Sequence, residues 1–247
     1  MATLSRLDIE MARRGLAESR EGARRLIMAG RVRVNSRPAL KPDLRVGSET
    51  PITVVPGAPD FASRAALKLI AAIDHFALDA RGRDALDVGA SNGGFTDVLL
   101  RHGAAHVIAL DVGYGQLALR LRRDPRVTVI DRTNIRLVKS GDLPYRPDLV
   151  AIDVSFISLR LVIPPVLELS ASPAVIIALV KPQFEVGRGM VGKGGIVRND
   201  GLRQSALDGI LEFAATQKLE IAGSMESPIT GASGNREFLA VFRKGGA

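Results

Sequence analysis

The feature that most restricts the fold of this chain is an alternation of strand-like and helix-like segments, which begins at Phe61 and continues almost to the C-terminus. Seven apolar segments are predicted to be strands: residues 85–88, 106–111, 127–130, 148–153, 174–180, 219–225 and 238–242. Helical patterns separate them, notably at residues 94–101, 116–122, 158–169 and 201–217. Such alternation is typical of an α/β protein with a mostly parallel sheet and helices on both faces.

The N-terminal quarter of the chain follows another pattern and predicts a small α+β domain. Its predicted elements are two helices and two strands, at residues 5–14, 19–30, 31–34 and 51–55. Ser19 is a suitable N-cap for the second helix, and Gly30 ends it. Because residues 56–59 have the composition of a linker, we expect two domains, residues 1–59 and 60–247.

Positive charge is concentrated in this N-terminal part. From Arg13 to Arg37 there are eight arginines and only two acids, Glu18 and Glu21, in a chain whose net charge is +8. One interpretation is a solvated, arginine-rich surface. The other is a surface that neutralises the phosphates of a polyanion and releases their counterions.

The composition excludes several classes of protein. The chain has no cysteine, which excludes a disulfide to a partner, a thiolate zinc site and a cysteine nucleophile, and we expect no metal site. Its longest aliphatic run, residues 174–180, is far shorter than the roughly 20 apolar residues of a membrane helix. The N-terminus lacks the apolar core of a signal peptide, so we expect a cytoplasmic protein without a membrane partner.

The first strand of the alternating region leads into a glycine-rich loop that has three interpretations. DVGASNGGF, residues 87–95, fits the G-x-S-x-G of a hydrolase, is close to a phosphate-binding P-loop, and suits a nucleoside cofactor. A hydrolase of this fold needs a histidine late in the chain, and the last histidine is His106. A P-loop needs lysine where Phe95 stands, and the similar segment 187–193 is followed by Gly194 in place of Ser or Thr. The cofactor interpretation is therefore favoured.

Two aspartates at the ends of the next strands support this interpretation. Asp111 ends the second strand, where its carboxylate can accept hydrogen bonds from two ribose hydroxyls. Asp131 ends the third strand, within reach of an adenine edge. Either aspartate could instead cap the turn that follows it. Together with the loop, the two aspartates favour S-adenosylmethionine as the cofactor.

Four further charged residues lie where a charge is costly unless it is used. Asp153 and Lys181 each end an apolar strand, Glu237 precedes the last strand, and Lys68 lies near the start of a helix. If the last strand runs antiparallel to the others, its start meets the edge at which the others end. The alternative explanation is a pair of structural salt bridges.

Long motifs then give a specific resemblance. This chain resembles the TlyA (hemolysin A) family in six motifs. They are SR (63–64) with KL (68–69), DVGASNGGFTD (87–97), DVGYGQL (111–117), DVSFISL (153–159), LVKPQFEVG (179–187) and SPITGASGNRE (227–237). Members of this family are ribose 2′-O-methyltransferases of ribosomal RNA, related to the FtsJ type. The N-terminal segment, with RLD at 6–8 and RGLAESR at 14–20, resembles an S4 RNA-binding domain.

The resemblance implies a fold and a set of site residues. The fold is a Rossmann-like class I S-adenosylmethionine-dependent methyltransferase with a seven-stranded, mostly parallel sheet, preceded by an S4-like domain. A Lys-Asp-Lys-Glu tetrad maps onto Lys68, Asp153, Lys181 and Glu237. The cofactor is expected at Asp87, Gly89, Ala90, Ser91, Asn92 (where the family pattern has Thr), Gly93, Gly94, Phe95, Asp111 and Asp131. RNA contacts are expected from Arg6, Arg13, Arg14, Ser19, Arg20, Arg24 and Arg64.

The resemblance also implies a reaction, in which methyl passes in line from the sulfonium of the cofactor to a ribose 2′-hydroxyl. Lys181 is expected to be the general base and Lys68 to position the hydroxyl, with Asp153 and Glu237 orienting the two amines. A lysine acts as a base only in its neutral form, which a second lysine nearby and partial burial both favour.

The expected partner is ribosomal RNA or a ribosomal subunit. The short chain favours a cytidine of 23S rRNA as the target, with 16S rRNA as a further target. Two rival hypotheses are a non-catalytic ribosome-assembly factor that binds rRNA and, from the older name of the family, a membrane-lytic hemolysin. The sequence predicts no oligomeric state.

Overall fold

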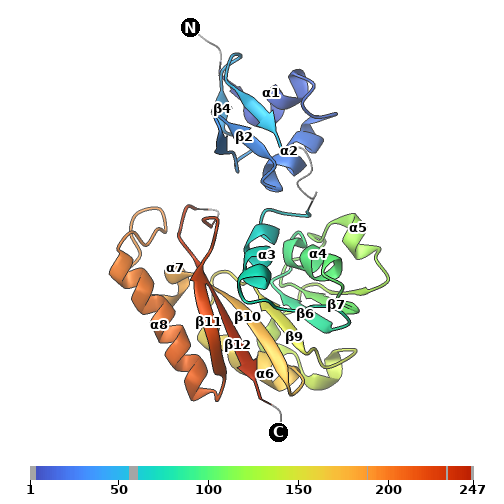
Figure 1. Cartoon of the computed structure of the whole chain (residues 1–247), viewed down its shortest axis with the longest axis vertical. Helices are drawn as coiled ribbons and strands as arrows, with labels where there is room; N and C mark the ends of the chain where they lie inside the picture. The colour runs from blue at the N-terminus through green and yellow to red at the C-terminus, as the bar shows by residue number, and fades with distance from the viewer. Residues whose placement is uncertain (1–3, 56–60, 188, 232, 246–247) are drawn as a thin grey trace. The chain divides into compact units, whose positions relative to one another are not determined.

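The computed structural model of the chain describes residues 4–55, 61–187, 189–231 and 233–245. The chain divides into two compact units, residues 1–66 and 67–247 (Figure 1). The predicted domain boundary at residues 59 and 60 and the predicted linker at residues 56–59 lie outside the described residues.

Residues 1–66 combine two helices with two small antiparallel sheets. The helices are α1 (Leu7–Arg13) and α2 (Arg20–Met28). The strands are β1 (Ser5–Arg6), which pairs with β4 (Arg45–Val46), and β2 (Val32–Val34), which lies between β3 (Arg37–Pro38) and β5 (Ile52–Val54). The first helix therefore starts later than predicted, because Ser5 and Arg6 pair with β4 as a strand.

The two helices of this unit cover a small apolar core. Leu7 and Met11 of α1 are fully buried, as are Ala23 and Ile27 of α2 and Val32 of β2. In each helix these two apolar residues lie four positions apart and therefore on one face. The two acids of α1, Asp8 and Glu10, are also buried and form ion pairs with arginines.

Residues 67–247 contain the seven-stranded sheet that the alternating pattern predicts. Its strands are β6 (Asp84–Val88), β7 (His106–Leu110), β8 (Val127–Ile130), β9 (Leu149–Ile152), β10 (Ala174–Val180), β11 (Glu220–Glu226) and β12 (Phe238–Lys244). They lie in the order β11-β12-β10-β9-β6-β7-β8. β6 to β10 are parallel, whereas β12 runs antiparallel to both β10 and β11. The predicted fold class is confirmed.

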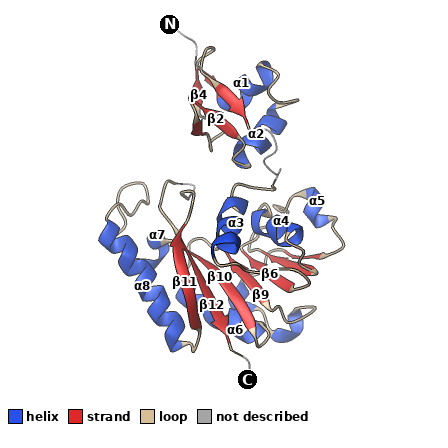
Figure 2. Ribbon diagram, in the orientation of Figure 1, coloured by secondary structure: helices blue, strands red, loops and turns tan. Residues whose placement is uncertain are grey.

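Helices cover both faces of this sheet. They are α3 (Ala66–His75), α4 (Gly94–Arg101), α5 (Leu119–Arg122), α6 (Ile163–Leu169), α7 (Pro182–Glu185) and α8 (Asp200–Thr216). Figure 2 shows α3 and α4 in front of the sheet and α6 behind it. α6 and α8 share one apolar core with the central strands.

Two predicted helices are shorter in the structure. The helix expected at 116–122 begins only at Leu119, because the backbone before it contacts the glycine-rich loop, where the Ala118 amide donates to the Asn92 carbonyl at 3.2 Å. The helix expected at 158–169 is a 3-10 turn (Leu159–Leu161) followed by α6. α6 has prolines in its first turn, where no intrahelical N–H donor is needed.

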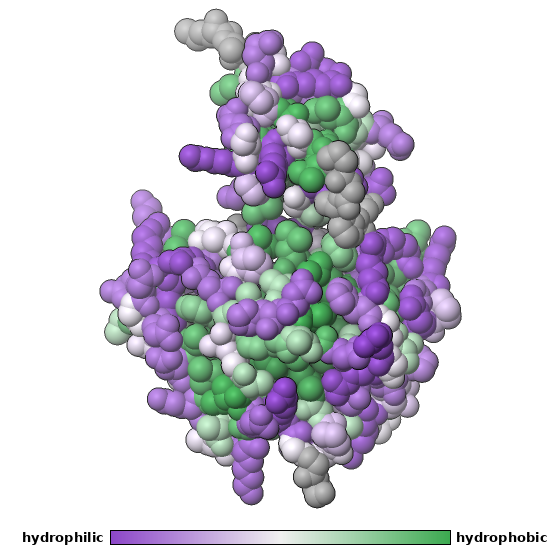
Figure 3. Space-filling model, viewed as in Figure 1, coloured by the Kyte–Doolittle hydropathy of each residue, from purple (hydrophilic) through white to green (hydrophobic). Residues whose placement is uncertain are grey.

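Burial differs between the centre and the edge of the sheet. All residues of β9 are buried, whereas β11 at the edge is only partly buried. Over this end of the sheet, Figure 3 shows apolar residues among hydrophilic ones. The continuous apolar runs of the central strands thus follow from burial on both faces.

The topology brings functional loops to one edge of the sheet. The carboxyl ends of the five parallel strands lie there, and the antiparallel β12 starts there, with Phe238 opposite Val180 at the end of β10. Ligands of open α/β sheets bind beyond this edge. The loops that follow β6, β7, β9 and β10, and the segment before β12, therefore form the candidate site.

Candidate functional site

The strand register places three of the four predicted tetrad residues side by side. Lys181 and Glu237 each lie one residue beyond the last β10–β12 pair, Val180 and Phe238. Asp153 directly follows β9, which pairs with β10 on the other side. The fourth residue, Lys68, comes from the first turn of α3.

Lys68 and Glu237 form a buried ion pair. The Lys68 Nζ lies 2.5 Å from Glu237 Oε2, and their side chains are only 7% and 3% exposed. The backbone of Gly231 packs so closely behind the carboxylate that a Cβ at this position would collide with it. This pair is therefore held rigidly inside the protein.

Lys181 makes a second ion pair, with a different environment. Its Nζ lies 2.6 Å from Asp153 Oδ1 and donates a hydrogen bond to Ser155 Oγ at 2.9 Å. The side chains of Lys181 and Asp153 are 10% and 17% exposed, so this pair is closer to solvent than the first. Asp153 and Ser155 also line a pocket, so both side-chain partners of Lys181 border the same cavity.

The pocket has a volume of about 940 Å³. Four of the predicted site residues line it: Gly89, Ser91, Asp111 and Asp153. Ala90, Asn92, Gly93, Gly94 and Phe95 belong to the same loop or to the start of α4 but are not among the described residues that line it. Lining residues that the sequence did not identify include Val112, Asn134, Ile135, Ser155 and Phe156.

The glycine-rich loop requires glycine at two places. Gly89 has φ 87°, and a Cβ there would collide with the backbone oxygen of Asp153. Gly93 has φ 93° and packs against the side chains of Leu117 and Leu121. Only glycine adopts a positive φ without strain and also allows such close contacts with neighbouring atoms. The loop therefore packs between the segment that follows β9 and the segment that follows β7.

Asp111 directly follows β7 and holds the loop in place. Its Oδ2 accepts a hydrogen bond from the Ser91 amide at 2.8 Å, and its Oδ1 accepts one from the Gly113 amide at 2.6 Å. The carboxylate nevertheless borders the pocket. A ribose hydroxyl could therefore approach an acceptor that is already oriented.

Asp131 accepts hydrogen bonds from an arginine and from a backbone amide. Arg122 Nη2 donates to Asp131 Oδ2 at 2.7 Å, and the Gly115 amide donates to the same oxygen at 3.2 Å. The arginine lowers the pKa of Asp131. Asn134 and Ile135, a few residues further along, line the pocket instead. The role of Asp131 at the adenine stays a prediction.

Asp87 is a fully buried acid inside the glycine-rich region. Its Oδ2 accepts hydrogen bonds from the Thr96 amide at 2.8 Å and the Thr96 hydroxyl at 2.7 Å. Its Oδ1 has no hydrogen-bond partner among the described residues. Burial raises the pKa of Asp87 to about 7.

Four of the six arginines expected to contact RNA fall into two pairs, each on one buried acid. Arg6 and Arg20 contact the buried Asp8, and Arg13 and Arg14 contact the buried Glu10. Arg24 lies 3.8 Å from the exposed Glu21.

The two other residues predicted to contact RNA, Ser19 and Arg64, lie at or near the starts of helices. Ser19 caps α2, and its hydroxyl accepts a hydrogen bond from the Gly22 amide at 3.0 Å. Arg64 lies just before α3 and is partly buried. Whether these residues touch RNA stays a prediction.

Within the described residues, no cluster of three or more His, Asp or Glu side chains could hold a metal ion. No helix in the described part of the chain is long and apolar enough to cross a membrane.

Comparison with known proteins identifies relatives of both units. A family profile described as FtsJ-like methyltransferase matches residues 61–244, and one described as S4 domain matches residues 5–52. The 16S/23S rRNA (cytidine-2′-O)-methyltransferase TlyA of Mycobacterium tuberculosis is 48% identical over 244 residues, which are 98% of this chain and 91% of that protein.

Solved structures agree with these matches. A candidate hemolysin from Streptococcus thermophilus is 38% identical with a TM-score of 0.77, over 99% of this chain and 90% of that one. A protein from Listeria monocytogenes, described as a candidate S-adenosylmethionine-dependent methyltransferase, shares the fold at 14% identity and a TM-score of 0.54, over 74% of this chain and 99% of that one. The chain belongs to the FtsJ-like methyltransferase family, in the TlyA (hemolysin A) group, and carries an S4 domain at residues 5–52.

Proposed function

We propose that this protein is an S-adenosylmethionine-dependent ribose 2′-O-methyltransferase of ribosomal RNA. The observation that carries the proposal is the pocket at the carboxyl edge of the sheet. Gly89 and Asp111 border it, and so do Asp153 and Ser155, the two residues that hold Lys181. The candidate cofactor pocket is thus bordered by the two residues that orient the lysine.

The residues of the pocket fit the proposed cofactor. Asp111 would offer its carboxylate to the ribose hydroxyls, and Gly89 and Ser91 border the space that the methionine part would occupy. The unpartnered Oδ1 of Asp87 lies in the same loop region, where an ammonium group could provide its missing partner. When bound, S-adenosylmethionine supplies an activated methyl group on its sulfonium.

The protein would then orient and deprotonate the attacking hydroxyl. A neutral lysine amine has two N–H donors and one lone pair. Asp153 and Ser155 accept from the Lys181 amine, so the lone pair takes a remaining tetrahedral position and can receive the hydroxyl proton. Lys68, fixed by Glu237, adds a second ion pair at the same edge of the sheet.

The substrate is inferred from relatives and from the exposed residues. The Mycobacterium tuberculosis relative is described as acting on cytidine in 16S and 23S rRNA. We infer the same class of target here, with 23S rRNA favoured. The exposed ring of Phe156 at the pocket offers a stacking surface for a base. An rRNA substrate would place the enzyme in the cytoplasm, where ribosomal subunits mature.

Transfer of a labelled methyl group tests the proposal. Purified protein is incubated with labelled S-adenosylmethionine and, separately, with 16S rRNA, 23S rRNA and the two ribosomal subunits. We expect label in at least one of these substrates. RNA binding without any transfer would instead favour the non-catalytic assembly factor, and lysis of liposomes at physiological salt would favour the membrane-lytic hypothesis.

A further inference from the structure

Asp8 is a buried carboxylate between two of the arginines expected to contact RNA. Arg6 donates to both of its oxygens, from Nε at 3.0 Å and from Nη2 at 3.1 Å. Arg20 donates to Oδ2 from Nε at 3.1 Å. The Asp8 side chain is fully buried, whereas those of Arg6 and Arg20 are 34% and 56% exposed. One acid thus holds two arginines whose outer parts reach solvent.

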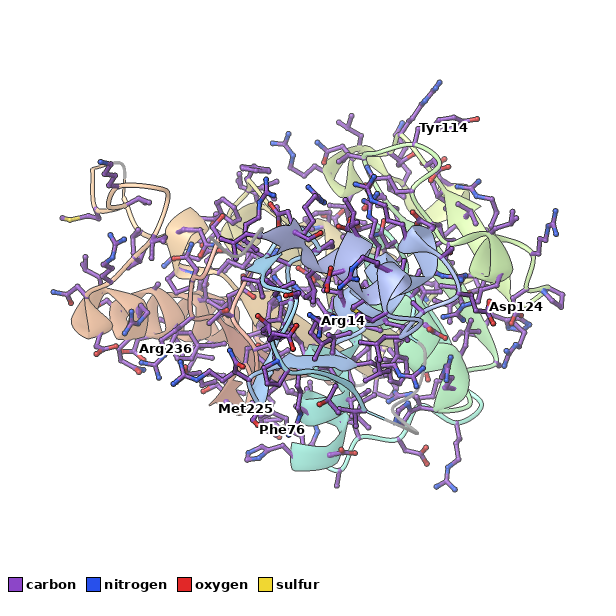
Figure 4. The ribbon with its side chains drawn as sticks, turned by 90° about the horizontal axis from the view of Figure 1, so that it is seen from above. Arg14, Phe76, Tyr114, Asp124, Met225 and Arg236 are labelled. Carbon is purple, nitrogen blue, oxygen red and sulfur yellow. The ribbon has the colours of Figure 1, made fainter. Side chains whose placement is uncertain are left out.

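Glu10 repeats this arrangement two residues later. Arg13 donates to both of its oxygens, at 2.9 and 2.6 Å, and Arg14 donates from Nε at 2.7 Å. Arg14 (labelled in Figure 4) also donates to the carbonyls of Thr50 and Gly47, so all three of its nitrogens are used. Arg13 is 60% exposed and keeps Nη1 without a partner among the described residues.

The negative charge of a buried acid beneath a polyanion-binding surface repels phosphates and by itself weakens binding. Yet the pKa values of both Asp8 and Glu10 are lowered to about 2, mainly by hydrogen bonds from Arg6 and Arg13 respectively, so both acids stay ionised at neutral pH. Ordering a flexible arginine on binding costs free energy, and a partner that fixes the guanidinium beforehand removes part of that cost. The benefit of orientation can therefore exceed the cost of the negative charge.

We propose that Asp8 and Glu10 are positioning residues that fix Arg6, Arg20 and Arg13 for contact with RNA phosphates. Arg14 is the exception, because its nitrogens are all used within the protein. This inference rests on the proposed rRNA substrate. It makes an unusual prediction, since removing a negative charge from this surface should weaken RNA binding.

The test measures binding of the full-length protein to transcribed 23S rRNA across a series of KCl concentrations. Asp8→Asn is compared with Glu21→Gln, which removes an exposed acid from the same unit. We expect Asp8→Asn to bind about tenfold more weakly and with a flatter salt dependence. Glu21→Gln should bind as tightly as the wild type or slightly more tightly. Unchanged or tighter binding by Asp8→Asn would overturn the inference.

A double-mutant cycle separates positioning from a purely structural role. If Asp8 acts through Arg20, then Arg20→Ala should weaken binding about tenfold in the wild type but less than about twofold in Asp8→Asn. Equal losses in both backgrounds would show that Asp8 does not act through Arg20. Arg20→Lys keeps the charge of a partly exposed residue and covers the case in which Asp8→Asn does not fold. It should bind several-fold more weakly, and unchanged affinity would contradict the inference.

The outcomes also distinguish this inference from the proposed function. Wild-type protein that does not bind rRNA would overturn both. Wild-type protein that binds and methylates rRNA while Asp8→Asn binds equally well would overturn only the positioning role.

Discussion

Lys181 and Asp153 contact each other at 2.6 Å beyond the ends of two neighbouring parallel strands, and Ser155 adds a second acceptor to the same amine. Lys68, in contrast, forms its ion pair with Glu237 away from solvent. The two lysines of the tetrad therefore differ in what they can do. The partners of Lys181 line the pocket, whereas Lys68 is held in a buried ion pair.

Replacing Lys181 with Met should abolish methyl transfer. The variant removes the only amine that Asp153 and Ser155 hold among the described residues, while the residues that border the cofactor pocket stay in place. Binding of S-adenosylhomocysteine, measured by calorimetry, should change by less than about threefold. Lys218→Met, at an exposed position after α8, is the matched control and should keep full activity. Full activity of Lys181→Met would remove Lys181 from the mechanism.

Ser155 should affect the rate more than cofactor affinity. Its hydroxyl is one of two acceptors that orient the Lys181 amine. Ser155→Ala should lower kcat about three- to tenfold, the effect of one hydrogen bond, and leave the KM for S-adenosylmethionine nearly unchanged. Ser155→Thr keeps the hydroxyl and should recover most of the rate. A pH–rate profile of Ser155→Ala that overlays the wild type, at an unchanged rate, would show that the hydroxyl has no part in orienting the base.

Gly89 and Gly82 make a matched pair for the glycine-rich loop. Both have positive φ, 87° and 69°, but a Cβ at Gly89 meets the Asp153 carbonyl, whereas a Cβ at Gly82 meets no described atom within 4 Å. Gly82→Ala should cost about 1 kcal/mol of unfolding free energy, the strain of a left-handed residue, without affecting S-adenosylhomocysteine binding. Gly89→Ala should cost more and weaken that binding at least tenfold. Equal losses of stability and equal S-adenosylhomocysteine binding in the two variants would contradict a close contact between Gly89 and Asp153.

Asp87 should make stability depend on pH. Its pKa rises from 3.8 to about 7 in the folded protein because it is buried. Between these values the folded state binds more protons than the unfolded state, so the free energy of unfolding falls as pH rises. The loss is on the order of 4 kcal/mol at most across this window.

Asp87→Asn isolates this effect, because all other titrating groups are shared with the wild type. Urea unfolding from pH 5 to pH 8 should show the wild type losing stability relative to the variant as pH rises. A constant difference between the two proteins across this range would show that Asp87 is ionised throughout.

Much of the fold was predictable because burial on both faces of the sheet leaves apolar runs in the sequence. The central strands are buried on both faces and read as continuous apolar runs, so a charged residue at the end of such a run, such as Asp153 or Lys181, stands out. Glu237 could be assigned to the same edge only if β12 is antiparallel, and it is.

The features that the sequence did not reveal depend on contacts between distant segments. Nothing near Ser155 shows that its hydroxyl meets a lysine 26 positions away. Arg13 and Arg14 are neighbours of identical chemistry, but of the two it is Arg14 that donates hydrogen bonds to the carbonyls of Gly47 and Thr50. The helix expected at 116–122 has a helical pattern, but packing against the glycine-rich loop shortens it.

The most direct test of the central claim is mass spectrometry of nucleosides from 23S rRNA incubated with the protein and S-adenosylmethionine. The account predicts 2′-O-methylcytidine with the wild-type protein and none with Lys181→Met. Methylation on a base, or no methylation of any rRNA or ribosomal subunit by the wild-type protein, would contradict it.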